Sequence, residues 1–197
     1  MQANIYSQNT SKFDLPSGPN EHYKDAIKQG DRLILTAKYG HRGGKGNKIV
    51  ILEGVKEMTT ISEHSPWDDD ENLALFAGNK FTDYSSVGLL NRNIIVVTAG
   101  KRGVIAIPID QIKIEEKTMY GYTYDVPTPH DVKTVSIGTY AEELATVKDK
   151  TVAYVLGKAA KEGSVLAEVK WSVQKNDLEV IRSHNIQESY ERFFIEV

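Results

Sequence analysis

The chain has 197 residues, of which 40% are hydrophobic and 26% are charged, the composition of a globular protein with an ordinary core. Its 24 basic and 27 acidic side chains leave a net charge of −3, which excludes a protein that coats nucleic acid by charge alone. The absence of cysteine excludes disulfides, thiolate nucleophiles and cysteine-ligated zinc or iron–sulfur clusters.

The first 20 residues are polar and contain Pro16 and Pro19, so we expect an extended N-terminal arm rather than a core element. They lack the basic start and apolar run of a secretory signal. No segment reaches the roughly 20 consecutive apolar residues of a transmembrane helix. The sequence therefore predicts a cytoplasmic protein, or one within a particle assembled in the cytoplasm, with no membrane contact.

The elements after the arm are expected to be mostly strands. Residues 21–29 suggest a short helix that ends at Gly30, and residues 69–77 and 140–148 suggest two further helices. Apolar alternation and apolar runs predict strands at 32–38, 48–55, 93–98, 103–109, 110–115, 151–156, 165–173, 177–182 and 192–197. The predicted class is a strand-rich α+β fold, a small β-barrel core with two or three helices.

Two prolines within residues 124–130 indicate a weakly marked domain boundary among the predicted elements. The sequence then divides into the arm (1–20), a β-rich region (21–124) and an α+β C-terminal region (125–197). The last two regions are alternatively one continuous domain.

A loop rich in glycine and lysine separates the two strands predicted within residues 30–55. This stretch resembles the opening hairpin of SH3-like barrels and the KOW motif of ribosomal and transcription-elongation proteins. Residues 94–114 resemble the distal part of such a barrel, where a hairpin leads into Ile107-Pro108 and a short closing strand. The resemblance implies a small β-barrel whose loop contacts RNA or the surface of a polymerase or ribosome.

The loop has its own physical argument, because glycine lets the backbone approach a phosphate closely and cationic side chains neutralise it. The alternative is a solvated hairpin loop. The loop lacks the spacing of a nucleotide-binding P-loop, so ATP hydrolysis is not expected. The candidate residues for binding nucleic acid or a protein partner are Lys38, His41, Arg42, Lys45 and Lys48.

Five carboxylates and His64 lie within residues 63–71. Carboxylate oxygens suit Mg²⁺, but acidic residues after Ser65-Pro66 are also typical of the first turn of a helix. A third interpretation is an ion-pairing surface for the basic loop or a partner.

Residues 165–173 alternate so that Glu168 and Lys170 share one face of the predicted strand. This pair resembles the Glu-x-Lys element of PD-(D/E)xK nucleases, and the resemblance implies that the carboxylate binds a metal and the lysine orients the attacking water. Asp149 or Glu143 would then supply further acids. No Pro-Asp precedes the strand, and the alternative is a simple amphipathic hairpin.

Tyr120, Tyr122 and Tyr124 alternate along one predicted strand and are candidates for a subunit interface or for base stacking. The five histidines are scattered, with no metal-binding spacing, so no metal or cofactor is expected.

Three functions remain open. The first is a non-catalytic structural, assembly or protein-interaction subunit of a viral particle or large complex, with other protein subunits as partners. The second is a nucleic-acid or ribonucleoprotein accessory factor that uses the basic loop. The third is a metal-dependent nuclease.

Overall fold

The computed structural model describes residues 21–29, 32–41, 44–53, 56–62, 84–119, 122–158 and 163–186. These residues form fourteen strands and one short 3-10 helix, arranged as antiparallel sheets. The predicted α+β class is therefore wrong, because the described part of the chain is nearly all β-structure. In those ranges no helix is long and apolar enough to cross a membrane.

Sheet A has the strand order β1-β2-β3-β4, and sheet B has the order β10-β7-β6-β5. Sheet C has the order β11-β12-β13-β14, and β8 pairs with β9 in a separate ribbon. The strands of sheet A are β1 (Glu21–Gln29), β2 (Arg32–His41), β3 (Gly44–Glu53) and β4 (Lys56–Ser62). Those of sheet B are β5 (Tyr84–Leu90), β6 (Ile94–Ala99), β7 (Val104–Pro108) and β10 (Lys133–Val135). Those of sheet C are β11 (Tyr140–Thr146), β12 (Val152–Lys158), β13 (Ser164–Ser172) and β14 (Asp177–Ile186). The ribbon comprises β8 (Ile112–Met119) and β9 (Tyr122–Pro129), and η1 (Ile109–Gln111) precedes it.

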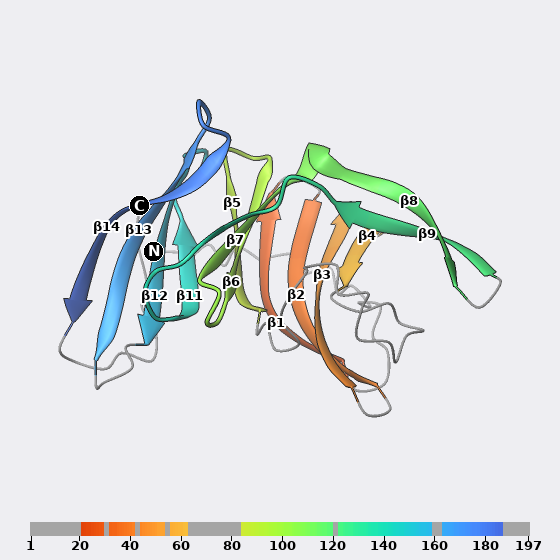
Figure 1. Ribbon diagram of the computed structural model, residues 1–197, viewed down its shortest axis with the longest axis horizontal. Helices are drawn as coiled ribbons and strands as arrows, with labels where there is room; N and C mark the ends of the chain where they lie inside the picture. The colour runs from red at the N-terminus through yellow and green to blue at the C-terminus, as the bar shows by residue number, and fades with distance from the viewer. Residues whose placement is uncertain are drawn as a thin grey trace, which may run out of the picture.

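Sheet B is the central layer of three, with sheet A on one side and sheet C on the other (Figure 1). All residues of β6 and β7 are buried, which explains why these strands are continuous apolar runs rather than alternating ones. The A–B core contains Ile34, Ile49, Ile51, Tyr84, Val87, Leu89, Ile95, Val97, Ala99, Ile105 and Ile107. The B–C core contains Leu90, Ile94, Val96, Val104, Ala106, Ile137, Ala141, Ala153, Val155, Ala167, Val169, Trp171 and Leu178.

Sheets B and C pack closely against one another where β5 contacts β11. A Cβ atom added to Gly88 would lie 2.4 Å from Thr146 Cγ2 and 2.7 Å from Leu144 Cδ1. Real Cβ atoms do not come this close, so glycine at this position lets the two layers pack directly.

The helix predicted at 21–29 is wrong, since these residues form β1. Burial along β1 alternates with a period of two: Tyr23, Asp25 and Ile27 are half-buried, whereas Lys24 and Lys28 are exposed. Ile27 packs against the A–B core. Its ladder with β2 supplies the backbone hydrogen bonds that a helix would otherwise provide.

The helix predicted at 140–148 is also wrong, since β11 occupies most of this range. Its alanine, glutamate and leucine residues favour a helix intrinsically, but pairing with β12 overrides that preference. The edge of β11 that faces sheet B is satisfied as well: Ala141 N donates to Gly100 O at 2.9 Å, and Thr98 Oγ1 donates to Glu142 O at 3.0 Å.

Polar contacts that are partly or fully buried join sheets A and B beside β5. The Asp25 carboxylate accepts hydrogen bonds from Ser86 Oγ at 2.7 Å and from Val87 N at 2.8 Å. Ser86 N donates to Thr98 Oγ1 at 2.8 Å. These contacts coincide with irregular register between β5 and β6, where the regular ladder leaves backbone groups unpaired.

Several sequence expectations lie outside the described residues, namely the arm at 1–20, the helix at 69–77, the acidic run at 63–71 and the strand at 192–197. The expected division between residues 124 and 125 falls inside β9. No helix lies in the described residues after 125, so the α+β description of that region does not hold there.

Candidate functional site

The basic stretch predicted as a loop is mostly strand. The β2–β3 ladder continues to the pair His41 and Gly44, which leaves only residues 42 and 43 between the strands. Register places Lys38 and Lys45 on one face of this hairpin. It places His41 and Lys48 on the opposite face, and Arg42 lies outside the described residues. Backbone register therefore assigns these four described basic positions to two different faces of the hairpin.

The predicted tyrosine interface falls on the β8–β9 ribbon. Tyr122 is opposite Met119 and Tyr124 is opposite Lys117, so the two tyrosine positions share one face of β9. Tyr120 lies outside the described residues. At the base of the ribbon, His130 Nε2 lies 2.7 Å from Glu115 Oε1, and His130 N donates to Gln111 O at 2.9 Å.

Two of the three predicted nuclease residues, Glu168 and Asp149, are engaged in separate ion pairs. Glu168 Oε2 accepts a hydrogen bond from Arg182 Nε at 2.6 Å, and this ion pair raises the pKa of the arginine. Lys170 is exposed on the same face of β13, opposite Glu179. Asp149 forms a two-point ion pair with Arg92 instead. The described residues contain no group of three or more histidines and carboxylates that could hold a metal ion.

Asp149 and Arg92 join the turn between β11 and β12 to the turn between β5 and β6. Arg92 Nε and Nη2 donate to the two carboxylate oxygens at 2.6 and 2.8 Å. Asn91 N donates to Lys150 O at 2.8 Å between the same turns. Both Arg92 and Asp149 have positive φ angles, which are typical of tight hairpin turns.

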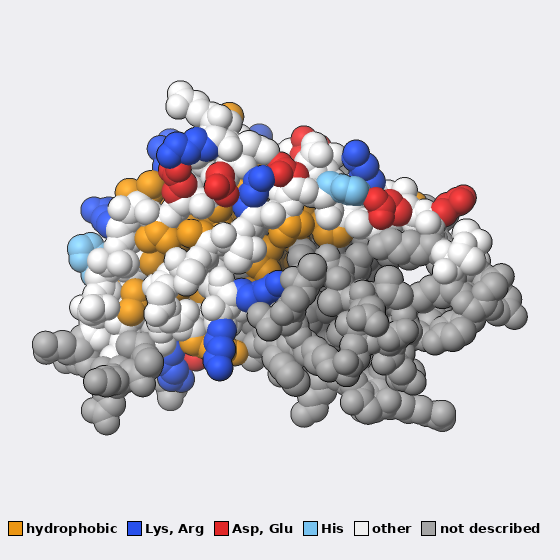
Figure 2. Space-filling view, viewed as in Figure 1, with side chains coloured by type: hydrophobic (Ala, Val, Ile, Leu, Met, Phe, Trp, Pro, Cys, Tyr) orange, Lys and Arg blue, Asp and Glu red, His pale blue; other side chains and the backbone are white. Residues whose placement is uncertain are grey.

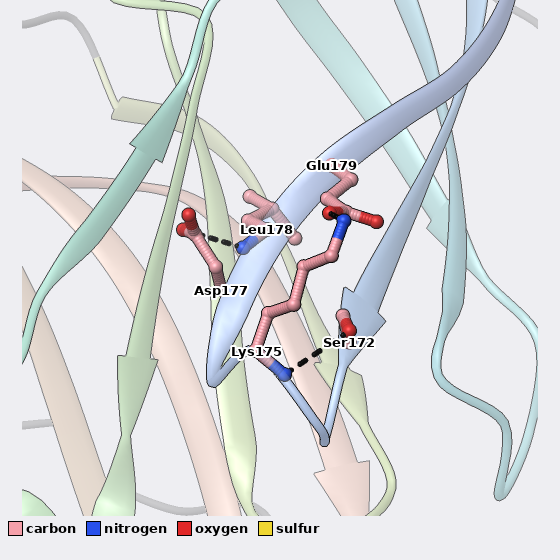
Figure 3. Close-up of polar contacts among 5 residues, drawn as sticks. All are labelled: Ser172, Lys175, Asp177, Leu178 and Glu179. Atoms are coloured by element: carbon pink, nitrogen blue, oxygen red, sulfur yellow. Dashed lines mark hydrogen bonds and ion pairs between the residues drawn. The ribbon is translucent and has the colours of Figure 1, made fainter.

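We call a polar contact that joins two turns or loops a clamp, and the ion pair of Arg92 with Asp149 is the first. A second clamp joins the turn between β13 and β14 to the segment before β10. Asp131 accepts a hydrogen bond from Asn176 and pairs with Lys133 Nζ at 2.6 Å. Figure 3 shows the turn itself, where Lys175 N donates to Ser172 Oγ and Lys175 Nζ lies 2.5 Å from Glu179 Oε1. Charged side chains of both signs alternate along the upper rim of the molecule (Figure 2).

Acid is expected to weaken both clamps. Hydrogen bonds from Arg92 lower the pKa of Asp149, and those from Lys133 and then Asn176 lower the pKa of Asp131. A carboxyl group whose pKa is lower in the folded state than in the unfolded state stabilises the folded state at pH values above its unfolded pKa, about 3.9. This stabilisation is lost as the pH falls through the folded pKa. The urea concentration at the midpoint of unfolding should therefore decrease when the pH is lowered below about 4.

The matched test is the double variant Asp131→Asn, Asp149→Asn, whose urea midpoint should depend less on pH over this range. The control is Asp110→Asn, an exposed aspartate outside both clamps. If the double variant and the control give the same pH profile, the two clamps do not contribute to acid sensitivity.

The described residues also form an open cleft that the sequence did not suggest. It lies between the β6–β7 turn and the start of β11, and has a volume of about 670 Å³. We call it the β6–β11 cleft; its lining residues are Lys101, Ser136, Gly138, Thr139, Tyr140, Glu142 and Lys158. This volume is within the range of small-molecule sites.

Tyr140 lies on the cleft wall beside Gly100. Gly100 has a φ of +54°, and a Cβ atom there would lie 2.9 Å from Tyr140 Cζ, so glycine makes room for the ring. Tyr140 is also the register partner of Lys158, at the end of β12. The tyrosine thus lies between the cationic residues of the cleft and a second hollow that shares Tyr140 and Glu142.

The cleft combines two lysines with one carboxylate. Lys158 Nζ lies 3.3 Å from Glu142 Oε1, and the lysine side chain remains 62% exposed. Ser136 Oγ accepts a hydrogen bond from Gly138 N at 3.1 Å. The Thr139 hydroxyl oxygen is buried and has no hydrogen-bond partner within the part of the chain that the structure describes. A buried hydroxyl without a hydrogen-bond partner is uncommon and costly in folded proteins.

No sequence signal could have found this cleft, because its residues come from three separate segments. Lys101 falls between two predicted strands, and Tyr140 and Glu142 fall in a segment predicted as a helix. The bridge between Gly100 and Ala141 and the pairing of Tyr140 with Lys158 bring these three segments together.

Comparison with known proteins adds no family to this description. No protein-family model matches the chain. No curated protein sequence is significantly similar to it either. The local resemblance to SH3-like and KOW hairpins stays a prediction, and the function has to be argued from the geometry.

Proposed function

We propose that this protein is a non-catalytic assembly subunit that docks to other protein subunits through the β8–β9 ribbon. The observation that carries the proposal is the ribbon itself. Among the described residues, β8 and β9 pair only with one another, and the ribbon extends from the central sheet past β4 (Figure 1). A two-stranded hairpin is marginally stable alone in water, so a long one is well explained by a contact partner.

The ribbon is anchored at its base and exposed further out. Ile112 packs against the A–B core, and the contact of His130 with Glu115 ties β9 to β8 at the same end. One step along the same face, Ile114 is 60% exposed. Ile112 therefore anchors the ribbon, whereas Ile114 offers apolar area to another molecule. The tyrosine positions at 122 and 124 lie on the other face of the ribbon.

Occupants other than protein are less well supported. Nucleic-acid binding would draw on the β2–β3 hairpin, whose basic positions are split between two faces. A nuclease would need Glu168 free for a metal, whereas it pairs with Arg182. The proposal also covers the setting of such a subunit, namely a viral particle or another large complex assembled inside a cell.

The test is the oligomeric state of the full chain. We expect light scattering to give masses above the monomer that rise with concentration. Ile114→Lys should weaken this association by about 2 kcal/mol, because it places a charge where apolar area is buried. The matched control is Ile181→Lys, at an isoleucine that is 50% exposed on sheet C.

Two outcomes would contradict the proposal. The wild-type protein would be a monomer at every concentration, or Ile181→Lys would dissociate the assembly as strongly as Ile114→Lys. Both variants should keep the thermal stability of the wild type, because exposed substitutions change it little.

A further inference from the structure

We propose that the β6–β11 cleft binds a small oxyanion, carried as a phosphate or a carboxylate on an organic ligand. Lys101 and Lys158 supply the charge, and the Thr139 hydroxyl supplies a further hydrogen bond. This site is separate from the ribbon, so it does not rest on the proposed assembly.

The charge of the cleft favours an anion. Two ammonium groups and one carboxylate line it, which leaves an excess of one positive charge. The Glu142 carboxylate is 29% exposed and 3.3 Å from Lys158 Nζ, a contact long enough for the exposed lysine to exchange for a stronger partner. Charge-assisted hydrogen bonds from lysine to an oxyanion are shorter and stronger than this.

The wall of the cleft supports the same ligand class. Gly138 has a φ of +78° and no atom near the position of a Cβ, so the backbone at this point is open to a ligand. Thr139 follows it, and its buried hydroxyl lacks a partner among the described residues. Because Thr139 lines the cleft while its hydroxyl oxygen is buried, donation from this hydroxyl to an oxyanion requires a change of the Thr139 side-chain rotamer.

The cleft is larger than an inorganic anion needs. Its volume of about 670 Å³ leaves room for an organic group beside Tyr140. A phosphate monoester and a carboxylic acid share the oxyanion chemistry that the lysines recognise, and separate probes distinguish them.

The experiment is an NMR titration of the full chain with inorganic phosphate and, separately, with acetate, each against chloride at equal ionic strength. We expect saturable shifts at residues 136–142 and at Lys101 and Lys158. Phosphate alone would identify a phosphate ligand, and acetate alone a carboxylate. Saturation by neither probe would overturn the proposal.

Variants localise the site. Lys101→Ala and Lys158→Ala should each weaken binding about tenfold, and Thr139→Val by about threefold, as expected for lost charged and neutral hydrogen bonds. Lys113→Ala, an exposed lysine on β8, is the matched control and should bind like the wild type. A lysine variant of the cleft that binds no more weakly than Lys113→Ala, or unchanged binding by Thr139→Val, would overturn the assignment.

Discussion

Replacing Ile95 by alanine is expected to lower the free energy of unfolding by about 4 kcal/mol. Ile95 is fully buried in β6, at the middle of the central sheet, and it faces the A–B core. Strands on both sides hold the backbone of β6 in place, so the surrounding atoms cannot collapse into the space that the side chain leaves. The loss therefore includes both the transfer free energy of the removed methylenes and the cost of the cavity.

Urea denaturation at neutral pH measures this loss, with the slope of the transition as a check that the unfolded state is unchanged. Ile181→Ala is the matched control, because this isoleucine is 50% exposed and should cost only about 0.5 kcal/mol. Equal losses in the two variants would mean that the three-layer arrangement is wrong, since that arrangement alone separates these two positions.

Replacing Asp25 by alanine is expected to cost about 3 kcal/mol. Its carboxylate accepts hydrogen bonds from Ser86 Oγ and Val87 N, at 2.7 and 2.8 Å, across the junction of sheets A and B. Ser86 is only 8% exposed, and Asp25 is half-buried. Val87 N would lose its acceptor, and Ser86 Oγ would keep only its longer hydrogen bond to Leu144 O, at 3.4 Å. A buried donor without a partner carries a desolvation penalty of about 1–3 kcal/mol.

Asp25→Asn separates the hydrogen bonds from the shape of the side chain. Asparagine keeps one acceptor oxygen, so this variant should lose about 1 kcal/mol and recover most of the stability. Asp110→Ala, at an exposed aspartate, should leave the urea midpoint unchanged. If Asp25→Ala were as stable as Asp110→Ala, the joint between the layers would not depend on this carboxylate.

Much of the strand content could be predicted, because strands with buried faces show apolar alternation or apolar runs in the sequence. The predicted strands at 32–38, 48–55, 93–98, 103–109, 151–156, 165–173 and 177–182 all correspond to observed strands. The strands at 93–98 and 103–109 are joined by a turn in which Arg102 N donates to Ala99 O at 3.0 Å. Strand β4 was not expected, because its threonines and polar residues show no clear alternation, and β5 was not expected either.

The two helix predictions that the structure contradicts were wrong for identifiable physical reasons. In residues 140–148, helix-favouring residues outnumber β-branched ones, and only the neighbouring strand β12 and the layer beneath reverse the preference. In residues 21–29, burial alternates at Tyr23, Asp25 and Ile27 as in a strand, although a glycine such as Gly30 after the segment is also typical of a helix end. Local propensity is a weak guide wherever a paired strand can take over the backbone hydrogen bonds.

The candidate sites were less predictable than the strands. Glu168 and Lys170 do share a face of β13, as alternation required, but the sequence could not show that Arg182 on the next strand neutralises Glu168. The basic positions looked like one loop because a linear reading ignores which face each residue occupies. The β6–β11 cleft had no sequence signature at all.

The sequence by itself determined that this chain is rich in strands, has no cysteine chemistry and carries both charges in nearly equal number. These properties depend on composition and on short-range periodicity, which a linear reading contains. The tertiary structure decided which sheet is buried on both faces, which ionic groups neutralise one another, and which ribbon and cleft remain available to a partner. Those properties depend on contacts between residues far apart in the chain, such as Arg92 with Asp149 and Asp25 with Ser86, and such contacts exist only after the sheets have packed.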